Sequence, residues 1–336
     1  MKKGELLGLV GESGCGKSVT TLAVVGLLPP NAEIISGEVM LDGTNLLSMK
    51  KEEMRKARLR DIAIVFQDPA TFLNPVLTIG SQVTEIMASD QAMFIPALVQ
   101  HRLDKMGEAE AKGERDQLEA GRERLLSALR TLKIGKREFR RLAKLYTISI
   151  LRSVRLPEPE KVFNMYPFEL SGGMRQRAMI AMALVRRPKL LLADEMTTAL
   201  DVTVQAQILQ LLKDLKKEID TSVLLVTHDL AVVAELCDRV AVMYAGNVVE
   251  VASVDELFRN PLHPYTRGLL ASVPRVDVSS PMEATIKGSV PNLISPPSGC
   301  RFNPRCPMAF ARCTAQKPRL IEVDQGHLVA CFLYGE

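Results

Sequence analysis

Short apolar runs alternate with longer stretches along most of the chain. The runs are rich in Leu, Val and Ile, and each one ends at a polar or glycine-containing turn. They are residues 6–10, 62–66, 189–195, 222–227 and 239–244. Between them, apolar residues recur at helical spacing, as over 19–28, 203–219 and 230–237. Strands that alternate with helices in this way predict an α/β fold with a mostly parallel sheet.

The same pattern divides the chain into three parts. Residues 1–79 and 166–259 carry the alternating strands and helices, and we expect them to form one α/β core. Residues 80–165 show mainly helical spacing, which predicts an inserted helical subdomain. After residue 260 prolines multiply and the periodicity fades. We therefore expect 260–336 to form a small module that is held by something other than a large core.

The composition narrows the function classes. The chain has 336 residues, a formal charge of +4, no Trp and only 4% aromatic residues. This mild charge and the few aromatic rings argue against a nucleic-acid partner. No stretch approaches the roughly 18–20 uninterrupted apolar residues of a membrane helix, and the first residues lack the apolar core of a signal peptide. We expect a cytosolic protein whose membrane role depends on partners.

Residues 11–18 form the strongest motif. Gly11-Glu-Ser-Gly-Cys-Gly-Lys-Ser18 matches G-x-x-x-x-G-K-[ST] and lies between a predicted strand and a predicted helix, as a phosphate-binding loop requires. Glycines let backbone N–H groups point at phosphates, while Lys17 would reach the β- and γ-phosphates and Ser18 would bind Mg²⁺. The ATP-binding candidates are Gly11, Glu12, Ser13, Gly14, Cys15, Gly16, Lys17, Ser18 and Thr20.

Three other predicted strands end in polar groups, which are Gln67, the pair Asp194-Glu195, and His228. Ligands bind at the carboxyl ends of parallel strands, so these groups should converge on the phosphate loop. There Asp194 would hold Mg²⁺ through water, and Gln67 would contact the same ion. Glu195 would act as general base on the attacking water, and His228 would bond that water or the γ-phosphate. The set predicts hydrolysis of a nucleoside triphosphate.

The order of these motifs resembles that of an ABC transporter ATPase. The matching segments are its Walker A, Q-loop, signature, Walker B, D-loop and H-loop, here residues 11–18, Gln67, 170–176, 190–195, 198–201 and His228. The Leu-Ser-Gly-Gly-x-x-Gln signature is the specific one, because it separates this family from other P-loop ATPases. The resemblance implies a P-loop NTPase core, ATP and Mg²⁺ as cofactors, and a head-to-tail dimer with two bound ATP molecules.

In such a dimer the signature residues would contact the ATP that is bound to the partner. In this chain they are Ser171, Gly172, Gly173 and Gln176. Ser171 is typical of a helix N-cap, and the glycine pair leaves backbone N–H groups open to an anion. Asp201 would be the D-loop residue.

A finer resemblance points to the importers of dipeptides, oligopeptides and nickel. Residues 66–75, 260–270 and 299–307 are similar to segments of their ATP-binding subunits. This implies a peptide-importer subunit, peripheral at the cytoplasmic face of the cell membrane. The implied partners are two membrane permeases, an extracytoplasmic substrate-binding protein and a second ATPase, in a heterodimer or a homodimer. The alternatives are nickel or oligosaccharide import, a soluble ABC ATPase of DNA repair or translation, and a catalytically weak structural subunit.

Four of the six cysteines crowd the C-terminus: Cys300, Cys306, Cys313 and Cys331. Disulfides are rare in a reducing cytosol, so the group first predicts a metal site. No C-x2-C pair is present, and a zinc ribbon is therefore not the obvious fit. Four thiolates suit a [4Fe–4S] cluster, and relatives with this tail are similar to cluster-binding ones. We expect the cluster to staple the proline-rich module, with Zn²⁺ and free thiols as the alternatives.

Three features depart from the family pattern. The family usually has a few dozen residues ahead of Gly4-Glu5 that supply edge strands and an aromatic ring for adenine, so we expect weak ATP affinity and a frayed sheet edge. Met196 replaces the usual proline after the Walker B glutamate. The helical region between Gln67 and Ser171 is longer than expected, and the extra length falls near 100–150.

Overall fold

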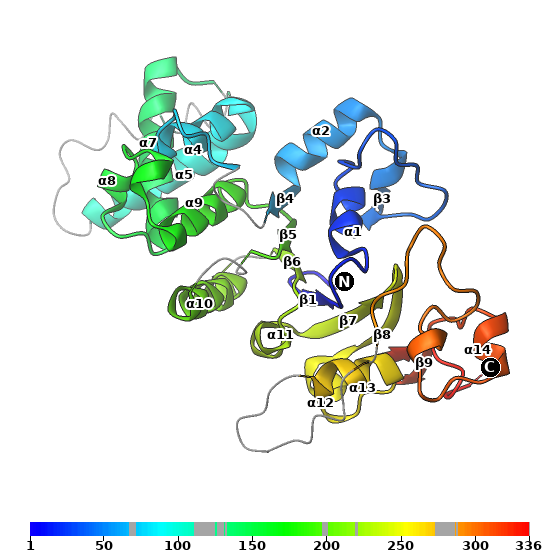
Figure 1. Cartoon of the computed structure of the whole chain (residues 1–336). Helices are drawn as coiled ribbons and strands as arrows, with labels where there is room; N and C mark the ends of the chain where they lie inside the picture. The colour runs from blue at the N-terminus through cyan, green and yellow to red at the C-terminus, as the bar shows by residue number, and fades with distance from the viewer. Residues whose placement is uncertain are drawn as a thin grey trace. The chain divides into compact units, whose positions relative to one another are not determined.

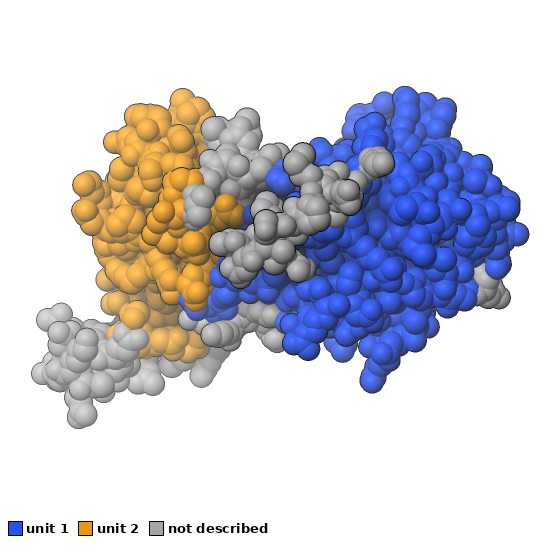
Figure 2. All heavy atoms as spheres, turned by 60° about the horizontal axis from the view of Figure 1, so that its bottom comes forward, with its two compact units in different colours: residues 1–64, 189–196, 212–336 blue, residues 65–188, 197–211 orange. Residues whose placement is uncertain are grey.

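The computed structural model describes most of the chain as two compact units (Figure 2). Unit 1 comprises residues 1–64, 189–196 and 212–336, and unit 2 comprises residues 65–188 and 197–211. The described residues are 1–66, 72–110, 125, 131, 133–196, 201–218, 221–272, 286 and 288–335.

An eight-stranded sheet runs through unit 1 in the order β4-β5-β6-β1-β7-β8-β10-β9 (Figure 1). The central strands β5, β6, β1 and β7 pair in parallel, and the strands from β7 to β9 pair in antiparallel fashion. The mostly parallel α/β fold predicted from the sequence is therefore confirmed. The strands are β1 Leu6–Val10, β4 Ile62–Val65, β5 Leu190–Asp194, β6 Ser222–Val226, β7 Arg239–Tyr244, β8 Asn247–Ser253, β9 Ile321–Asp324 and β10 His327–Val329.

The strand order places three functional segments side by side. β6 lies between β5 and β1, and Val226 at its end is level with both Asp194 of β5 and Leu9 of β1. These strands are nearly continuous apolar runs because helices and loops cover both faces of a parallel sheet. The phosphate loop, the acidic pair and the segment leading to His228 therefore leave the sheet at the same edge.

Helices pack on the sheet within unit 1 and close two apolar cores. One core joins the phosphate loop and the helix after it to the sheet through Leu9, Cys15 and Val25, and the other gathers around Tyr244, Tyr265 and Phe302. The helices are α1 Lys17–Val24, α2 Lys51–Arg60, α11 Leu230–Leu236, α12 Val254–Arg259 and α13 Pro264–Ala271. The longer α10, Val202–Glu218, begins in unit 2 and ends in unit 1. A turn at Asp42-Gly43 joins the short strands β2 Met40–Leu41 and β3 Thr44–Asn45.

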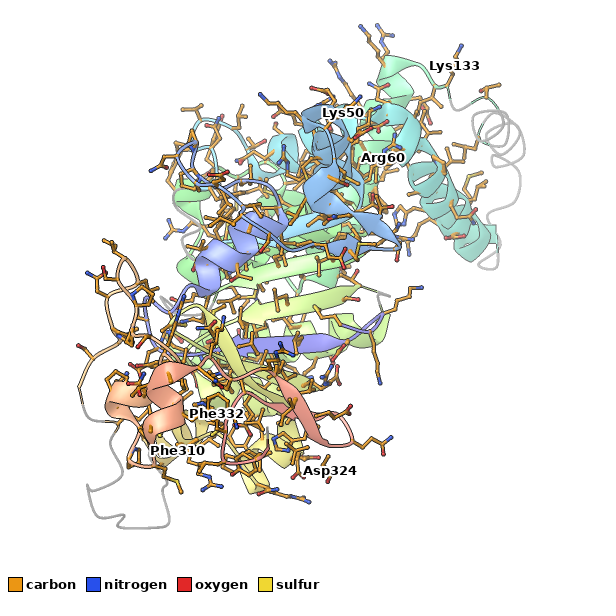
Figure 3. All side chains as sticks on the ribbon, turned by 90° about the vertical axis from the view of Figure 1, so that its right-hand side faces the viewer. Lys50, Arg60, Lys133, Phe310, Asp324 and Phe332 are labelled. Atoms are coloured by element: carbon orange, nitrogen blue, oxygen red, sulfur yellow. The ribbon has the colours of Figure 1, made fainter. Side chains whose placement is uncertain are left out.

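The described C-terminal residues 288–335, here called the cysteine module, belong to unit 1 (Figure 2). The module contains a 3₁₀ turn, η4 Asn303–Arg305, the short helix α14 Ala311–Ala315, and the hairpin β9–β10. Figure 3 marks Asp324 at the tip of this hairpin, and Phe310 and Phe332 elsewhere in the module. β10 pairs with β8, so the module extends the main sheet. These strands could not be predicted from the sequence, because they are too short to show alternation.

Unit 2 is helical over most of its described length. Its helices are α4 Ile79–Ala88, α5 Gln91–Glu110, α7 Lys136–Ser153, α8 Pro159–Val162 and α9 Gly172–Leu184. The apolar faces of α4, α5 and α7 meet in one core around Val83, Leu98, Leu142 and Tyr146. The charged stretch after Glu110 lies largely outside the described residues. Among the helices of the described ranges, none is both long enough and apolar enough to cross a membrane.

Candidate functional site

Residues 11–18 form a loop between β1 and α1, as the motif predicts. Three glycines adopt positive φ angles, namely Gly11 at 156°, Gly14 at 78° and Gly16 at 104°. A Cβ atom on Gly11 would overlap the carbonyl oxygen of Met243 in β7, so glycine is required there by both conformation and space. Gly16 is the N-cap of α1, and the loop thus opens directly onto a helix N-terminus, where backbone N–H groups favour anions.

Lys17 folds back over the loop that contains it. Its ammonium group donates hydrogen bonds to the carbonyl oxygens of Gly11, at 2.8 Å, and Glu12, at 3.0 Å. Cys15 is fully buried and forms part of the core beneath the loop, where burial raises the pKa of its thiol. Cys15 therefore anchors the loop as a small apolar residue, and Lys17 supplies the positive charge at its centre.

Ser18 and Asp194 meet at the end of the sheet. The Ser18 hydroxyl donates to Oδ1 of Asp194 across 3.2 Å, although the two residues are 176 positions apart in sequence. Asp194 is only 8% exposed, and burial raises the pKa of its carboxyl group above the ordinary value. A hydroxyl and a carboxylate in contact form an oxygen pair of the kind that Mg²⁺ binds beside a phosphate.

Glu195 and His228 form a second pair at the same edge. Nδ1 of His228 lies 3.4 Å from Oε1 of Glu195. Glu195 has a left-handed backbone, with φ at 46°, and its N–H donates to the carbonyl oxygen of Val226. A non-glycine residue held in this conformation is a mark of functional sites. Next to His228, Asp229 caps α11 by accepting from the N–H groups of Ala231 and Val232, which fixes the turn that carries the histidine.

The signature residues lie in unit 2, at the start of α9. Ser171 is the N-cap, and its hydroxyl accepts from the N–H of Met174 at 3.4 Å. A Cβ atom on Gly173 would come within 2.5 Å of the Val204 side chain, so close packing against α10 requires glycine there. Gln176 is buried. Asp201 accepts from the N–H of Val204 and thereby caps α10.

Some predicted residues lie outside the described part of the chain. They are Gln67 and residues 198–200 of the D-loop segment. Of the groups predicted to converge, the structure brings together Ser18, Asp194, Glu195 and His228 at one edge of the unit 1 sheet. Thr20 faces back into its own helix, since its hydroxyl donates to the carbonyl oxygen of Gly16 at 3.0 Å.

Comparison with known proteins identifies the family. A model of the ABC transporter family matches residues 1–198, and one of the oligopeptide/dipeptide transporter C-terminal region matches residues 249–313. The chain belongs to the ABC transporter family. It is 44% identical to the oligopeptide transport ATP-binding protein AppD of Bacillus subtilis, covering 100% of this chain and 89% of the relative. It is 43% identical to the Escherichia coli oligopeptide transport ATP-binding protein OppD, covering 99% of this chain and 85% of that one.

Solved structures agree with this assignment to the ABC family. The dimeric ATP-binding cassette MJ0796 with bound ADP and phosphate has a TM-score of 0.53 and 27% identity over 76% of this chain and 87% of that chain. A Clostridium perfringens cassette, cbiO1, has a TM-score of 0.55 and 25% identity over 77% of this chain and 81% of that chain. As an ABC ATPase, the chain is an ATP hydrolase that works with ATP and Mg²⁺.

The four C-terminal cysteines of this ABC ATPase gather around one pocket. Cys300, Cys306, Cys313 and Cys331 all line it, together with His263 and Phe302. All four cysteines are free thiols. Burial raises the thiol pKa of Cys300, Cys306 and Cys331, the last to about 11. Within the described ranges, no three His, Cys, Asp or Glu side chains lie close enough together to hold a single metal ion.

Two residues that belong to none of the predicted motifs, Tyr265 and Arg305, contact the phosphate loop. The hydroxyl of Tyr265 accepts from the N–H of Glu12 at 2.9 Å, and Arg305 donates to the Glu12 carboxylate at 3.0 Å. Tyr265 lies in a segment that resembles the peptide-importer subfamily, and Arg305 stands beside Cys306, but neither position carries a signal that it reaches residue 12. Only the fold reveals these contacts.

Proposed function

We propose that this chain is the ATP-hydrolysing subunit that powers the import of peptides by a membrane ABC transporter. The observation that carries the proposal is the 44% identity to an oligopeptide transport ATP-binding protein along the whole chain. The match of residues 249–313 to the oligopeptide/dipeptide C-terminal region supports it. The cargo is assigned by this similarity.

The two residue pairs at this end of the sheet, Ser18–Asp194 and Glu195–His228, support separate roles in ATP hydrolysis. Ser18 and Asp194, in contact at 3.2 Å, would hold the Mg²⁺, which would neutralise negative charge on the phosphates. Lys17 would leave the loop carbonyls and neutralise the β- and γ-phosphates. Glu195 would take a proton from the attacking water, and His228, 3.4 Å away, would orient Glu195 or that water. Gln67 keeps its proposed role as a contact to the ion.

The signature residues are proposed to complete the site of a second ATPase subunit. Ser171, Gly172 and Gly173 open α9, where N–H groups and the helix dipole favour a phosphate. Gln176 would support this turn from within the helix, and Asp201 would face the partner across the dimer. The second ATPase would be a homologue of this chain or a second copy of it.

The remaining partners follow from the importer proposal. We propose two membrane permeases and an extracytoplasmic substrate-binding protein, with this chain peripheral at the cytoplasmic face of the membrane. The lack of a membrane-spanning helix among the described residues fits attachment through permeases. Cargo selection would then depend on the permeases and the binding protein.

Transport by the reconstituted complex tests the function. The complex that contains this chain is placed in liposomes with ATP inside the compartment that the ATPase faces, and uptake of labelled di- and oligopeptides is followed with ATP hydrolysis. We expect peptide to stimulate hydrolysis and uptake, and Glu195→Gln to abolish both. Stimulation by nickel or by oligosaccharides alone would contradict the peptide assignment. A wild-type complex that hydrolyses no more ATP than Glu195→Gln would contradict the catalytic role of this chain.

We also propose that the four thiols hold a [4Fe–4S] cluster. A single zinc ion needs sulfurs about 2.3 Å from the metal, which the described thiols are not close enough together to supply. A cluster is larger than one ion, so its four thiolates stand farther apart, around a pocket such as the one they line. Raised thiol pKa values mean that cluster binding would release protons.

Metal analysis of the full chain tests the cluster. Purified without oxygen, the wild-type chain should be brown and should contain about four iron and four sulfide per chain. Cys306→Ser should lose both, whereas Cys237→Ser, which leaves all four module thiols in place, should keep them. Zinc without iron would contradict the cluster and show that the thiols bind a zinc ion. A colourless chain without either metal would contradict it too and show that the four thiols are free.

A further inference from the structure

The cysteine module is joined to the ATP site by one ion pair. Arg305, in the 3₁₀ turn before Cys306, places Nη1 at 3.0 and 3.2 Å from the two carboxylate oxygens of Glu12, the second residue of the phosphate loop. We propose that Arg305 is a positioning residue for the phosphate loop and that ATP affinity depends on it. This proposal goes beyond the transport function and rests only on the ATP binding of the family.

The ion pair is built to hold one geometry. The Arg305 side chain is only 7% exposed, and Glu12 is 26% exposed. The other arm of the guanidinium, Nη2, donates to the carbonyl oxygen of Gly288 at 3.0 Å, and Nη1 also reaches the hydroxyl of Tyr244 at 3.3 Å. Because both terminal nitrogens of the planar guanidinium are hydrogen-bonded, the Arg305 side chain has little freedom to adopt another position, and Glu12 is held in one place. Loss of either partner would leave the other charge poorly compensated in a largely buried site.

A second contact holds the backbone of the same loop residue. The N–H of Glu12 donates to the hydroxyl of Tyr265 across 2.9 Å. Tyr265 is fully buried and packs against the rings of Tyr244 and Phe302 at 4.6 and 5.5 Å. Burial raises the pKa of Tyr265, so its hydroxyl stays neutral and available as an acceptor. Glu12 is thus fixed by its side chain through Arg305 and by its backbone through Tyr265.

A third contact holds the far side of the loop. The N–H of Gly246, in the turn after β7, donates to the carbonyl oxygen of Cys15 at 2.8 Å. Arg301 of the cysteine module donates to the carbonyl oxygen of Ala245 in that same turn. Residues 12–15 of the phosphate loop therefore form hydrogen bonds to Arg305 of the module, and to Tyr265 and Gly246, which lie next to module residues. A loop that is held in its binding geometry before ATP arrives loses less entropy on binding.

The fold around the thiols sets the position of Arg305. Asn303, at the start of the same 3₁₀ turn, donates through Nδ2 to the carbonyl oxygens of Ser298 and Cys300, each at 2.8 Å. The N–H of Cys300 donates to the carbonyl oxygen of Cys313 at 2.8 Å. Two of the four cysteines, Cys300 and Cys313, therefore belong through their backbone groups to the short hydrogen-bond network that positions Arg305 against Glu12. A change in this network would alter the position of Arg305 at the phosphate loop.

ATP affinity of the full chain tests the proposal. Binding of a fluorescent ATP analogue with Mg²⁺ is measured for wild type, Arg305→Gln, Glu12→Gln and the control Arg319→Gln, an exposed arginine of the same module that has no role at the loop. We expect about tenfold weaker binding for the first two variants, the size of one lost charge-assisted hydrogen bond, and no change for the control. In the reconstituted transporter, the KM for ATP should rise by the same factor while kcat at saturating ATP is kept.

A double-mutant cycle separates positioning from general damage. Arg305→Gln combined with Glu12→Gln should bind ATP no more weakly than either single variant, because both remove the same contact. Arg305→Lys keeps the charge and should recover part of the affinity. Unchanged binding in Arg305→Gln, or losses that multiply in the double variant, would overturn the proposal. If Arg305→Gln does not fold, Glu12→Gln and Arg305→Lys decide, since unchanged ATP binding in both would overturn it equally.

Discussion

The Ser18 hydroxyl donates a hydrogen bond of 3.2 Å to Oδ1 of Asp194. This contact joins the first turn of α1 to the end of β5, which are far apart in sequence and are brought together by the parallel sheet. Both oxygens belong to residues that are proposed to hold Mg²⁺. The contact therefore brings two proposed ion ligands together, and Asp194 is the residue whose replacement we expect to change the Mg²⁺ dependence of hydrolysis the most.

Asp194→Asn should raise the Mg²⁺ concentration required for ATP hydrolysis. The amide keeps the size of the side chain and its hydrogen bond to Ser18, but it removes the negative charge that attracts the ion. We expect about a 10- to 100-fold rise in the Mg²⁺ concentration for half-maximal activity. The measurement is a Mg²⁺ titration at fixed ATP. Asp255→Asn, at an exposed position in the first turn of α12, serves as the control, and an equal shift in both variants would contradict the role of Asp194.

Glu195→Gln should separate ATP binding from hydrolysis. The amide is isosteric but cannot accept the proton of the attacking water, and removal of a general base costs about 10²- to 10⁴-fold in rate. Binding of ATP should persist, because the phosphate loop and the contact between Ser18 and Asp194 are untouched. The readouts are phosphate release and nucleotide titration. Glu235→Gln, which removes an exposed ion pair with Lys213, should leave both near wild type.

Gly11→Ala should destabilise the loop that Gly14 and Gly16 help to shape. The new methyl group would overlap the carbonyl oxygen of Met243, which is backbone and cannot move aside. We expect a loss of about 1–3 kcal/mol in the free energy of unfolding, with weaker ATP binding. Thermal denaturation with and without ATP measures both effects. Gly135→Ala is the matched control, because that glycine has a negative φ and open space around it. Gly135 is an N-cap, where glycine is preferred to alanine, so we expect a loss of up to about 1 kcal/mol in the free energy of unfolding but unchanged ATP binding.

His263 should make the chain sensitive to acid. It is almost fully buried at the N-cap of α13, where Nδ1 accepts from the N–H of Tyr265, and burial lowers its pKa to about 4. The folded state therefore keeps the ring neutral, while the unfolded chain takes up a proton near pH 6.5. The contribution of the neutral His263 ring to the free energy of unfolding is fully present above pH 6.5. It falls by up to about 1.4 kcal/mol per pH unit as the pH drops towards 4.

His263→Asn tests this pH dependence. Asparagine can accept from the same N–H group but does not titrate in this range, so the cap is kept and the proton uptake is removed. Free energies of unfolding measured between pH 7 and pH 4 should fall less steeply for the variant than for wild type. Equal slopes in the two proteins would contradict the assignment of the acid sensitivity to His263.

The local motifs could be predicted because their information lies in adjacent residues. The loop at residues 11–18 needs glycines at fixed positions and a lysine before a helix, and the acidic pair at 194–195 directly ends an apolar run. Such patterns follow from backbone geometry and from the period of each element. The convergence of Asp194 and His228 could be predicted as well, because parallel strands end at one edge of a sheet.

Other features depend on packing that leaves no periodic trace. β10 joins the main sheet through only a few residues, too short a strand to show the alternation that marks strands in a sequence. Glu250 of β8 accepts from Nε2 of the buried His327 at 2.8 Å, a pairing between residues 77 positions apart. Neither residue is part of a motif, so the extension of the sheet by the C-terminal segment required the structure.

By itself, the sequence identified the family of this protein and predicted the phosphate-binding loop, the ion ligands and the general base. Only the tertiary structure determined what holds that chemistry in place. Arg305 and Glu12 are 293 positions apart, and their ion pair exists because the aromatic cluster of Tyr244, Tyr265 and Phe302 brings the cysteine module to the loop. The physical reason is that a local motif specifies which groups can bind a phosphate, whereas packing between residues distant in sequence restrains the positions of those groups.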